Sequence, residues 1–152
     1  MFRISSLWSR VVAYELLSHP ADVKFRADGA SLEAAFRVAL GAVAAIVTDG
    51  QPVPAGAGQT RSVAIEARIP ETLLLDFLDR VILFQDVENA VVTGVRECSI
   101  VEVETGFEWT ATLVGVAIGP QGMTMDPKAP TYSELAVSET GDGWTLDAVI
   151  AV

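Results

Sequence analysis

Two short motifs, each bent by proline, hold the side chains best suited to chemistry. In the first, His19 and Asp22 lie three positions apart on either side of Pro20. Proline fixes its own φ and disfavours helical geometry for the residue before it, so this turn can bring an imidazole and a carboxylate to one edge. A small polar site is the functional interpretation. The structural interpretation, which the frequency of aspartate turns favours, is that Asp22 closes the turn and His19 packs nearby.

The second motif runs from Asp126 to Tyr132 and has the sequence DPKAPTY. Two prolines restrict its backbone, and Lys128 between them is a lone cation at the entrance to a predicted strand. Its ammonium group suits a phosphate or a carboxylate of a partner. An equally supported alternative is a surface ion pair with Asp126, which contributes little to stability.

The remaining carboxylates and the single cysteine indicate no further site. The chain has no Gly-rich phosphate loop, no GxSxG motif and no HExxH motif. Cys98 excludes an intramolecular disulfide and a cysteine-ligated zinc site, and we expect it to be a small core residue. A chain with 20 acidic residues scatters carboxylates over its surface, so we expect ordinary exposed positions rather than a calcium or magnesium loop for Asp22, Asp86, Asp126, Asp142 and Asp147.

The composition bounds the class of protein. The chain has 152 residues, of which 51% are hydrophobic, which is ample for one core and excludes intrinsic disorder. No apolar run is long enough to span a membrane and no secretion signal is present, so we expect a cytoplasmic protein. A net charge of -10 disfavours nucleic acid and anionic membranes as direct partners. We expect an N-terminal extension over residues 1–10 and a single domain over residues 11–152.

The elements that position these motifs follow from hydrophobic periodicity. Val23, Phe25 and Ala27 alternate with charged neighbours and are predicted to face the core from a strand. Ser31 is a candidate helix N-cap, and Pro70 is expected to open a second helix. Strands are expected over residues 11–17, 23–27, 63–67, 91–104, 109–113, 131–138 and 144–152. The order ββαβαββββ predicts an α+β protein with two helices packed on a mostly antiparallel sheet.

Four segments of the chain resemble motifs of the archease family and follow one another in the order found in that family. The resemblance extends from Tyr14 to the last residue. Residues 14–23, YELLSHPADV, look like the opening motif of that family. Residues 73–88, LLLDFLDRVILFQDVE, are similar to its second helix, and residues 128–132, KAPTY, to its lysine motif. Residues 143–152 resemble its terminal strand.

The resemblance implies a function. Archeases are non-catalytic accessory proteins of RtcB-type RNA ligases, which join tRNA halves and repair broken RNA. They promote guanylylation and turnover of the ligase. The implied partner of this chain is therefore such a ligase. We expect neither nucleic acid nor a membrane to be a direct partner.

The resemblance also implies a calcium site, carried over residue by residue. Asp22 matches the first metal-binding aspartate and Val152 matches the terminal ligand, while His19, Lys128 and Tyr132 match functional or contact positions. Ala151 stands where the family has its second aspartate and offers no donor atom, so we expect weak or absent calcium binding. Asp147 shares the face of Ala151, but four residues of strand separate the two by roughly 13 Å. Two further departures fall beside the site, where Pro20 replaces a threonine and Ser133 a histidine.

Two alternatives remain open from the sequence. The chain can be a diverged relative that keeps the archease fold and serves as a protein-interaction or chaperone-like module with a degenerate metal site. A small hydrolase that uses His19 and Asp22 is the third interpretation, although the sequence offers it no convincing nucleophile or oxyanion donors.

Overall fold

The computed structural model describes residues 14–19, 22–48, 58–117, 127 and 129–152. The expected extension over residues 1–10 lies outside these residues. The elements follow one another as β1 (Tyr14–His19), β2 (Asp22–Gly29), α1 (Leu32–Thr48), β3 (Gly58–Ala67), α2 (Pro70–Glu88), β4 (Ala90–Val103), β5 (Gly106–Ala117), β6 (Ala129–Thr140) and β7 (Gly143–Ala151). The predicted α+β class and the order ββαβαββββ are confirmed.

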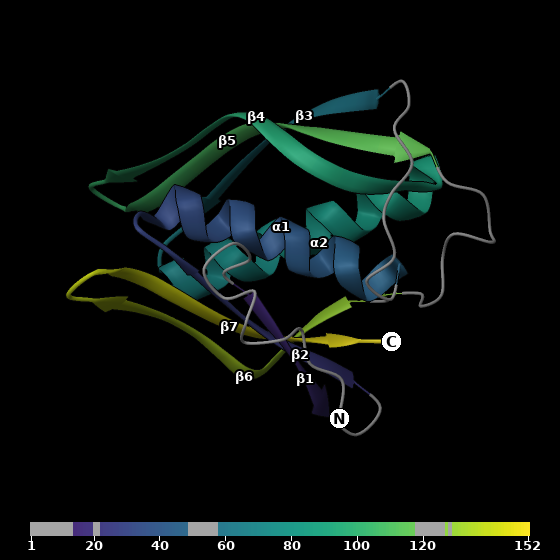
Figure 1. The fold of residues 1–152 in the computed structure, drawn as a ribbon. Coiled ribbons are helices and arrows are strands. Elements are labelled where there is room, and N and C mark those ends of the chain that lie inside the picture. The colour runs from purple at the N-terminus through teal and green to yellow at the C-terminus, as the bar shows by residue number, and fades with distance from the viewer. Residues whose placement is uncertain (1–13, 20–21, 49–57, 118–126, 128) are drawn as a thin grey trace.

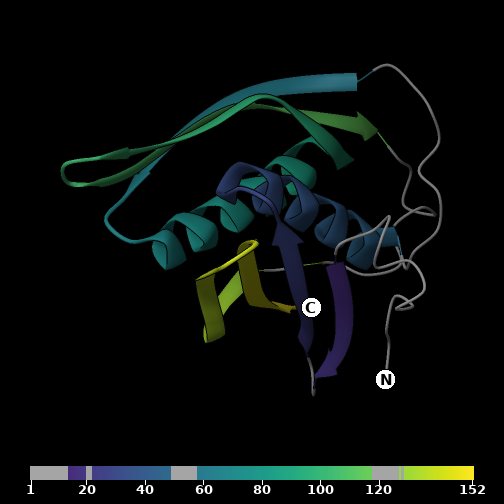
Figure 2. The same cartoon turned by 60° about the vertical axis from the view of Figure 1, so that its left-hand side comes forward.

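The strands divide into two antiparallel sheets, with both helices packed between them (Figures 1 and 2). The four-stranded sheet has the order β1-β2-β7-β6, and the three-stranded sheet has the order β3-β5-β4. The sequence led us to expect one sheet, because alternation shows which side chains face inward and does not show which strands pair. The final strand, β7, lies inside its sheet between β2 and β6.

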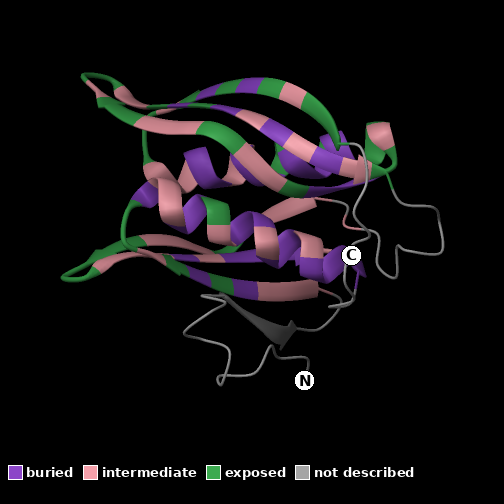
Figure 3. Cartoon of the chain, turned by 45° about the horizontal axis from the view of Figure 1, so that its top comes forward, coloured by how far each residue is buried: buried purple, intermediate pink, exposed green. Residues whose placement is uncertain are grey.

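Helix α1 is buried on most of its circumference because a sheet covers it on each side (Figure 3). Its buried residues include Phe36, Leu40 and Ile46. The predicted N-cap is confirmed, since Ser31 Oγ accepts a hydrogen bond from the Ala34 amide at 3.1 Å. Neither helix in the described part of the chain has the length and apolar content needed to cross a bilayer.

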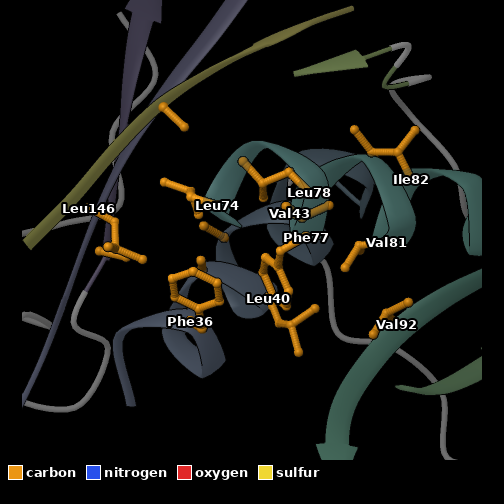
Figure 4. Close-up of a cluster of buried hydrophobic side chains, with 14 of the residues drawn as sticks. Phe36, Leu40, Val43, Leu74, Phe77, Leu78, Val81, Ile82, Val92 and Leu146 are labelled. Carbon is orange, nitrogen blue, oxygen red and sulfur yellow. The ribbon is translucent and has the colours of Figure 1, made fainter. Parts of the chain in front are cut away.

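Helix α2 begins at Pro70, as predicted, and ends at Asn89, which adopts the left-handed conformation with φ 50°. The Asn89 amide donates to the Gln85 carbonyl oxygen and so closes the last turn. The buried side of α2 includes Leu74, Phe77 and Leu78 (Figure 4).

A line of aromatic rings joins the helices to the three-stranded sheet. Phe77 lies 4.8 Å from Phe36 of α1 and 4.9 Å from Trp109 of β5, measured between ring centroids. Leu146 of β7 belongs to the same core cluster and brings the four-stranded sheet into it (Figure 4). The two sheets therefore share one hydrophobic core across the helix layer.

A wide bulge interrupts β6. Thr131 pairs with Val149 and Ala136 pairs with Asp147, so residues 132–135 lie against Ala148 alone. Glu134 within this segment has a φ of 56°, a left-handed conformation that is uncommon for residues other than glycine. Strand β6 runs from Ala129 to Thr140 and is longer than the predicted 131–138. The bulge breaks its alternation of inward and outward side chains.

Candidate functional site at the end of the four-stranded sheet

One row of residues crosses all four strands of the four-stranded sheet at the end where the two proline-containing motifs meet. His19 of β1 lies opposite Asp22 of β2, and Asp22 lies opposite Ala151 of β7. Ala151 in turn lies opposite Ala129 of β6. Lys128, which precedes Ala129 in the sequence, lies outside the described residues. The strand pairing thus brings residues 19–22, near the start of the sequence, into one row with residues 129 and 151, near its end.

The side chains of Asp22 and Ala151 share the outer face of the sheet. Successive residues of a strand point to opposite faces, and directly paired residues point to the same one. Phe25 and Ala27 are fully buried against the helices, as predicted for the inward face of β2. Asp22 therefore points outward, away from the helices, and it is half-buried there.

Polar pairs follow Asp22 along this outer face. Lys24 Nζ lies 3.0 Å from Glu134 Oε1, and Arg26 Nε lies 2.7 Å from Asp147 Oδ1. Beyond them, the Thr145 hydroxyl donates to Asp28 Oδ1 at 2.7 Å. Asp147 therefore has a cationic partner of its own, four positions along β7 from Ala151 on a ladder without irregularities.

The side chains that the structure describes at the row do not by themselves make up the ligands of a calcium ion. A directly opposed pair places its Cβ atoms about 4.5–5.5 Å apart, so an aspartate at position 151 would bring a second carboxylate beside Asp22. Alanine supplies a methyl group there, and Val152 packs against the hydrophobic core. Calcium takes about six to eight oxygen ligands. Among the described residues, no group of three or more His, Cys, Asp or Glu side chains is arranged to hold a metal ion.

Tyr132 is the most conspicuous contact candidate that the structure describes. Its side chain is 74% exposed at the start of the β6 bulge. The Ser133 amide donates to Thr131 Oγ1 at 3.2 Å, and Lys24 of β2 holds Glu134 inside the bulge. The bulge therefore presents an aromatic ring to solvent from a segment with side-chain contacts to β6 itself and to β2.

Sequence analysis missed the contribution of Lys24 and Glu134 to this presentation. Lys24 gave one signal, because it lies two residues after Asp22 on the polar side of an alternating strand. Glu134 gave none, since a bulge is not visible in the hydrophobic pattern.

Cys98, Asp86 and Asp142 lie away from this row. The Cys98 thiol is half-buried and accepts a hydrogen bond from Trp109 Nε1 at 3.3 Å. Burial raises the pKa of the Cys98 thiol above its ordinary value of 9.0, so it stays protonated near neutral pH and is not an activated nucleophile. Its contact with the core cluster agrees with the predicted core role. Asp86 and Asp142 are exposed, and Asp126 lies outside the described residues.

Comparison with known proteins identifies the family. The model of the archease protein family matches residues 14–152. The protein archease of Methanosarcina acetivorans is 31% identical over 142 residues, which cover 91% of this chain and 95% of that protein. The protein archease of Thermococcus kodakarensis is 30% identical over 133 residues, covering 86% and 91% of the two chains.

A solved structure agrees with this assignment. The solution structure of protein 1598 from Methanobacterium thermoautotrophicum superposes with a TM-score of 0.73 at 25% identity, over 91% of this chain and 98% of that one. The match to the family model begins at Tyr14, where β1 begins, and runs through the row formed by Asp22 and Ala151. The chain belongs to the archease family.

Proposed function

We propose that this protein is a non-catalytic accessory factor of an RtcB-type RNA ligase in the cytoplasm. In this role it promotes guanylylation and turnover of the ligase during tRNA splicing and RNA repair. The observation that carries the proposal is the family match over residues 14–152. The register of the four-stranded sheet supports it, because the opening motif, the start of β6 that carries the lysine motif, and the terminal strand meet at one end of that sheet.

Charge supports docking on a ligase. The chain has a net charge of -10, and an enzyme that binds RNA presents a basic surface. Opposite charges speed the encounter of two proteins and orient them. In this proposal Asp22, Lys128 and Tyr132 contact the ligase, and their differential affinity shifts it toward the conformation that accepts the nucleotide.

The direct test is multiple-turnover RNA ligation by the cognate ligase, with and without this protein. We expect the protein to raise both the number of turnovers and the guanylylated fraction of the ligase. Asp22→Ala and Lys128→Ala should each reduce this stimulation. Asp142→Ala, which removes one charge from an exposed position in the turn between β6 and β7, is the matched control and should stimulate normally. Unchanged guanylylation with both site variants would overturn the proposal.

Calcium has a subordinate place in this function. We propose that the chain binds calcium weakly or not at all, because Ala151 supplies no oxygen opposite Asp22. Calorimetric titration of the unchanged chain should show little heat, whereas Ala151→Asp should add a carboxylate and increase the affinity. A sub-micromolar dissociation constant for the unchanged chain would contradict this proposal.

The second candidate function is a protein-interaction or chaperone-like module that has kept the fold without the ligase. The specific observation that favours it is the methyl group of Ala151 facing Asp22 in the row. Co-purification separates the candidates, because an accessory factor retains the ligase through its purification. A chain that never retains the ligase and never stimulates it, yet suppresses aggregation of other proteins, would establish the module.

A further inference from the structure

A groove opens at the end of the molecule opposite the C-terminus, where the hairpin of β4 and β5 extends past the start of α2 (Figures 1 and 2). Its volume is about 1140 Å³. Its lining comes from the hairpin, from the end of β3 and from the first turn of α2. None of the family motifs contributes to it.

Close backbone packing shapes the groove. Gly106, in the turn between β4 and β5, has a φ of 145°, and a Cβ at this position would lie 2.2 Å from the Ala67 carbonyl oxygen. Only glycine lets the hairpin turn lie directly on the end of β3. The register then sets Phe107 between Ala67 and Glu102 in one row, and Glu108 between Glu66 and Val101 in the next.

The groove offers apolar surface without a cover. Ile69, the residue before α2, lines the groove and is 52% exposed. Phe107, Ala67 and Val103 line the groove and are only half-buried. Exposed apolar side chains that gather in a concave site are typical of interaction surfaces.

Carboxylates surround this apolar lining. Glu66, Glu102, Glu104 and Glu108 line the groove and are exposed, and Arg68 is the one cationic residue among the described residues that do so. None of the four glutamates forms an ion pair with another described residue. Their summed potential favours a positively charged occupant.

We propose that this groove docks an extended segment of a partner protein that carries arginine or lysine on both sides of an apolar side chain. The apolar side chain lies against Ile69 and Phe107, and the flanking cations pair with Glu102, which lies opposite Phe107, and with Glu104 in the adjoining turn. A bare metal ion would leave the apolar lining uncovered, and an RNA backbone would be repelled. The inference goes beyond the proposed function and does not depend on it.

The test is a nuclear magnetic resonance titration of the full-length, ¹⁵N-labelled protein. The probe is an end-capped peptide with arginine on both sides of a central leucine. We expect amide shifts confined to residues 66–72 and 101–108. Replacing both arginines by glutamine in the peptide, or introducing Glu102→Gln with Glu104→Gln in the protein, should raise the dissociation constant at least about fivefold.

Two controls keep the outcome interpretable. Glu139→Gln with Asp142→Asn removes the same charge from exposed positions around the β6–β7 turn and should leave the affinity unchanged. Ile69→Ser tests the apolar contact without altering charge and should weaken binding. The proposal is overturned by shifts spread over the surface, by equal affinity for the glutamine peptide, or by calcium alone shifting the same amides. These results do not involve the ligase, so they leave the proposed function standing or failing on its own test.

Discussion

Among the residues that the structure describes, the outer face of the four-stranded sheet carries charged side chains in ion pairs, whereas the outer face of the three-stranded sheet carries them without such partners. Arg26 lies 2.7 Å from Asp147 on the first. On the second, Glu66 lies opposite Glu108 at one end, next to small and hydroxyl side chains. Paired charges hold neighbouring strands in place, while carboxylates without a cation keep their electrostatic potential for a partner. The pairs on the first face therefore support the motif row, whereas Glu66 and Glu108 on the second face add to the negative potential around the groove.

The two sheets nevertheless use the same device at their hairpins. Gly106 of the β4–β5 hairpin and Gly143 of the β6–β7 hairpin have φ values of 145° and 154°. A Cβ on either one would lie 2.2 Å from a carbonyl oxygen, that of Ala67 or that of Gly29. The β4–β5 hairpin therefore lies against the end of β3, and the β6–β7 hairpin lies against the end of β2.

The largest expected effect comes from removing the contact that joins the sheets through the helices. Phe77→Ala should lower the free energy of unfolding by about 3–5 kcal/mol, because it leaves a cavity between the rings of Phe36 and Trp109. Urea denaturation measures the loss. Leu83→Ala, at a side chain 51% exposed on the same helix, should change stability far less.

The Phe77→Ala variant also tests whether the two sheets unfold together. Amide hydrogen exchange should accelerate in both sheets of the Phe77→Ala protein, since both pack on one core. Acceleration confined to β3, β4 and β5 would show that the four-stranded sheet is stable on its own and would separate the two regions.

The next effect concerns the hairpin glycines. Gly106→Ala and Gly143→Ala should each cost about 1–3 kcal/mol, because alanine is strained at these φ values and its methyl group meets a carbonyl oxygen. Thermal or urea unfolding measures both. Gly141→Ala, whose methyl group would meet nothing within 4 Å, is the control. A large loss of unfolding free energy at one hairpin alone would show that the two turns share their geometry but do not contribute equally to stability.

The smallest effect distinguishes the paired from the single carboxylate. Asp147→Asn removes the partner of Arg26 and should lower the free energy of unfolding by about 0.2–1 kcal/mol, because the pair is partly exposed. Glu108→Gln removes a charge that lies opposite Glu66 and should be neutral or slightly stabilising. The difference should shrink as salt is added. An equal loss from both substitutions would contradict the contrast between the faces.

Much of the local structure could be predicted from residue patterns. The Ser31 cap, the Pro70 start and the inward side chains Phe25 and Ala27 all follow from local chemistry and periodicity. The division into two sheets could not be predicted, because pairing depends on contacts between distant segments, such as Asp22 with Ala151.

The candidate site was predictable in its residues but not in its arrangement. The sequence singled out Asp22, Ala151 and Tyr132, and only the register of three strand pairs shows that the first two share a row. The bulge that presents Tyr132 leaves no trace in alternation. The groove at the β4–β5 hairpin escaped notice because its glutamates are scattered along three strands and a turn, without a motif.

The position of β7 between β2 and β6 has a consequence for biosynthesis. Strand β2 leaves the ribosome early, yet its partner β7 consists of residues 143–151. The edge of β2 that pairs with β7 must therefore wait until residues 30–142 have been translated before its sheet can close. A chain cut short before residue 143 would leave this edge of β2 without its partner strand, and such a product would be a target for proteolysis and aggregation.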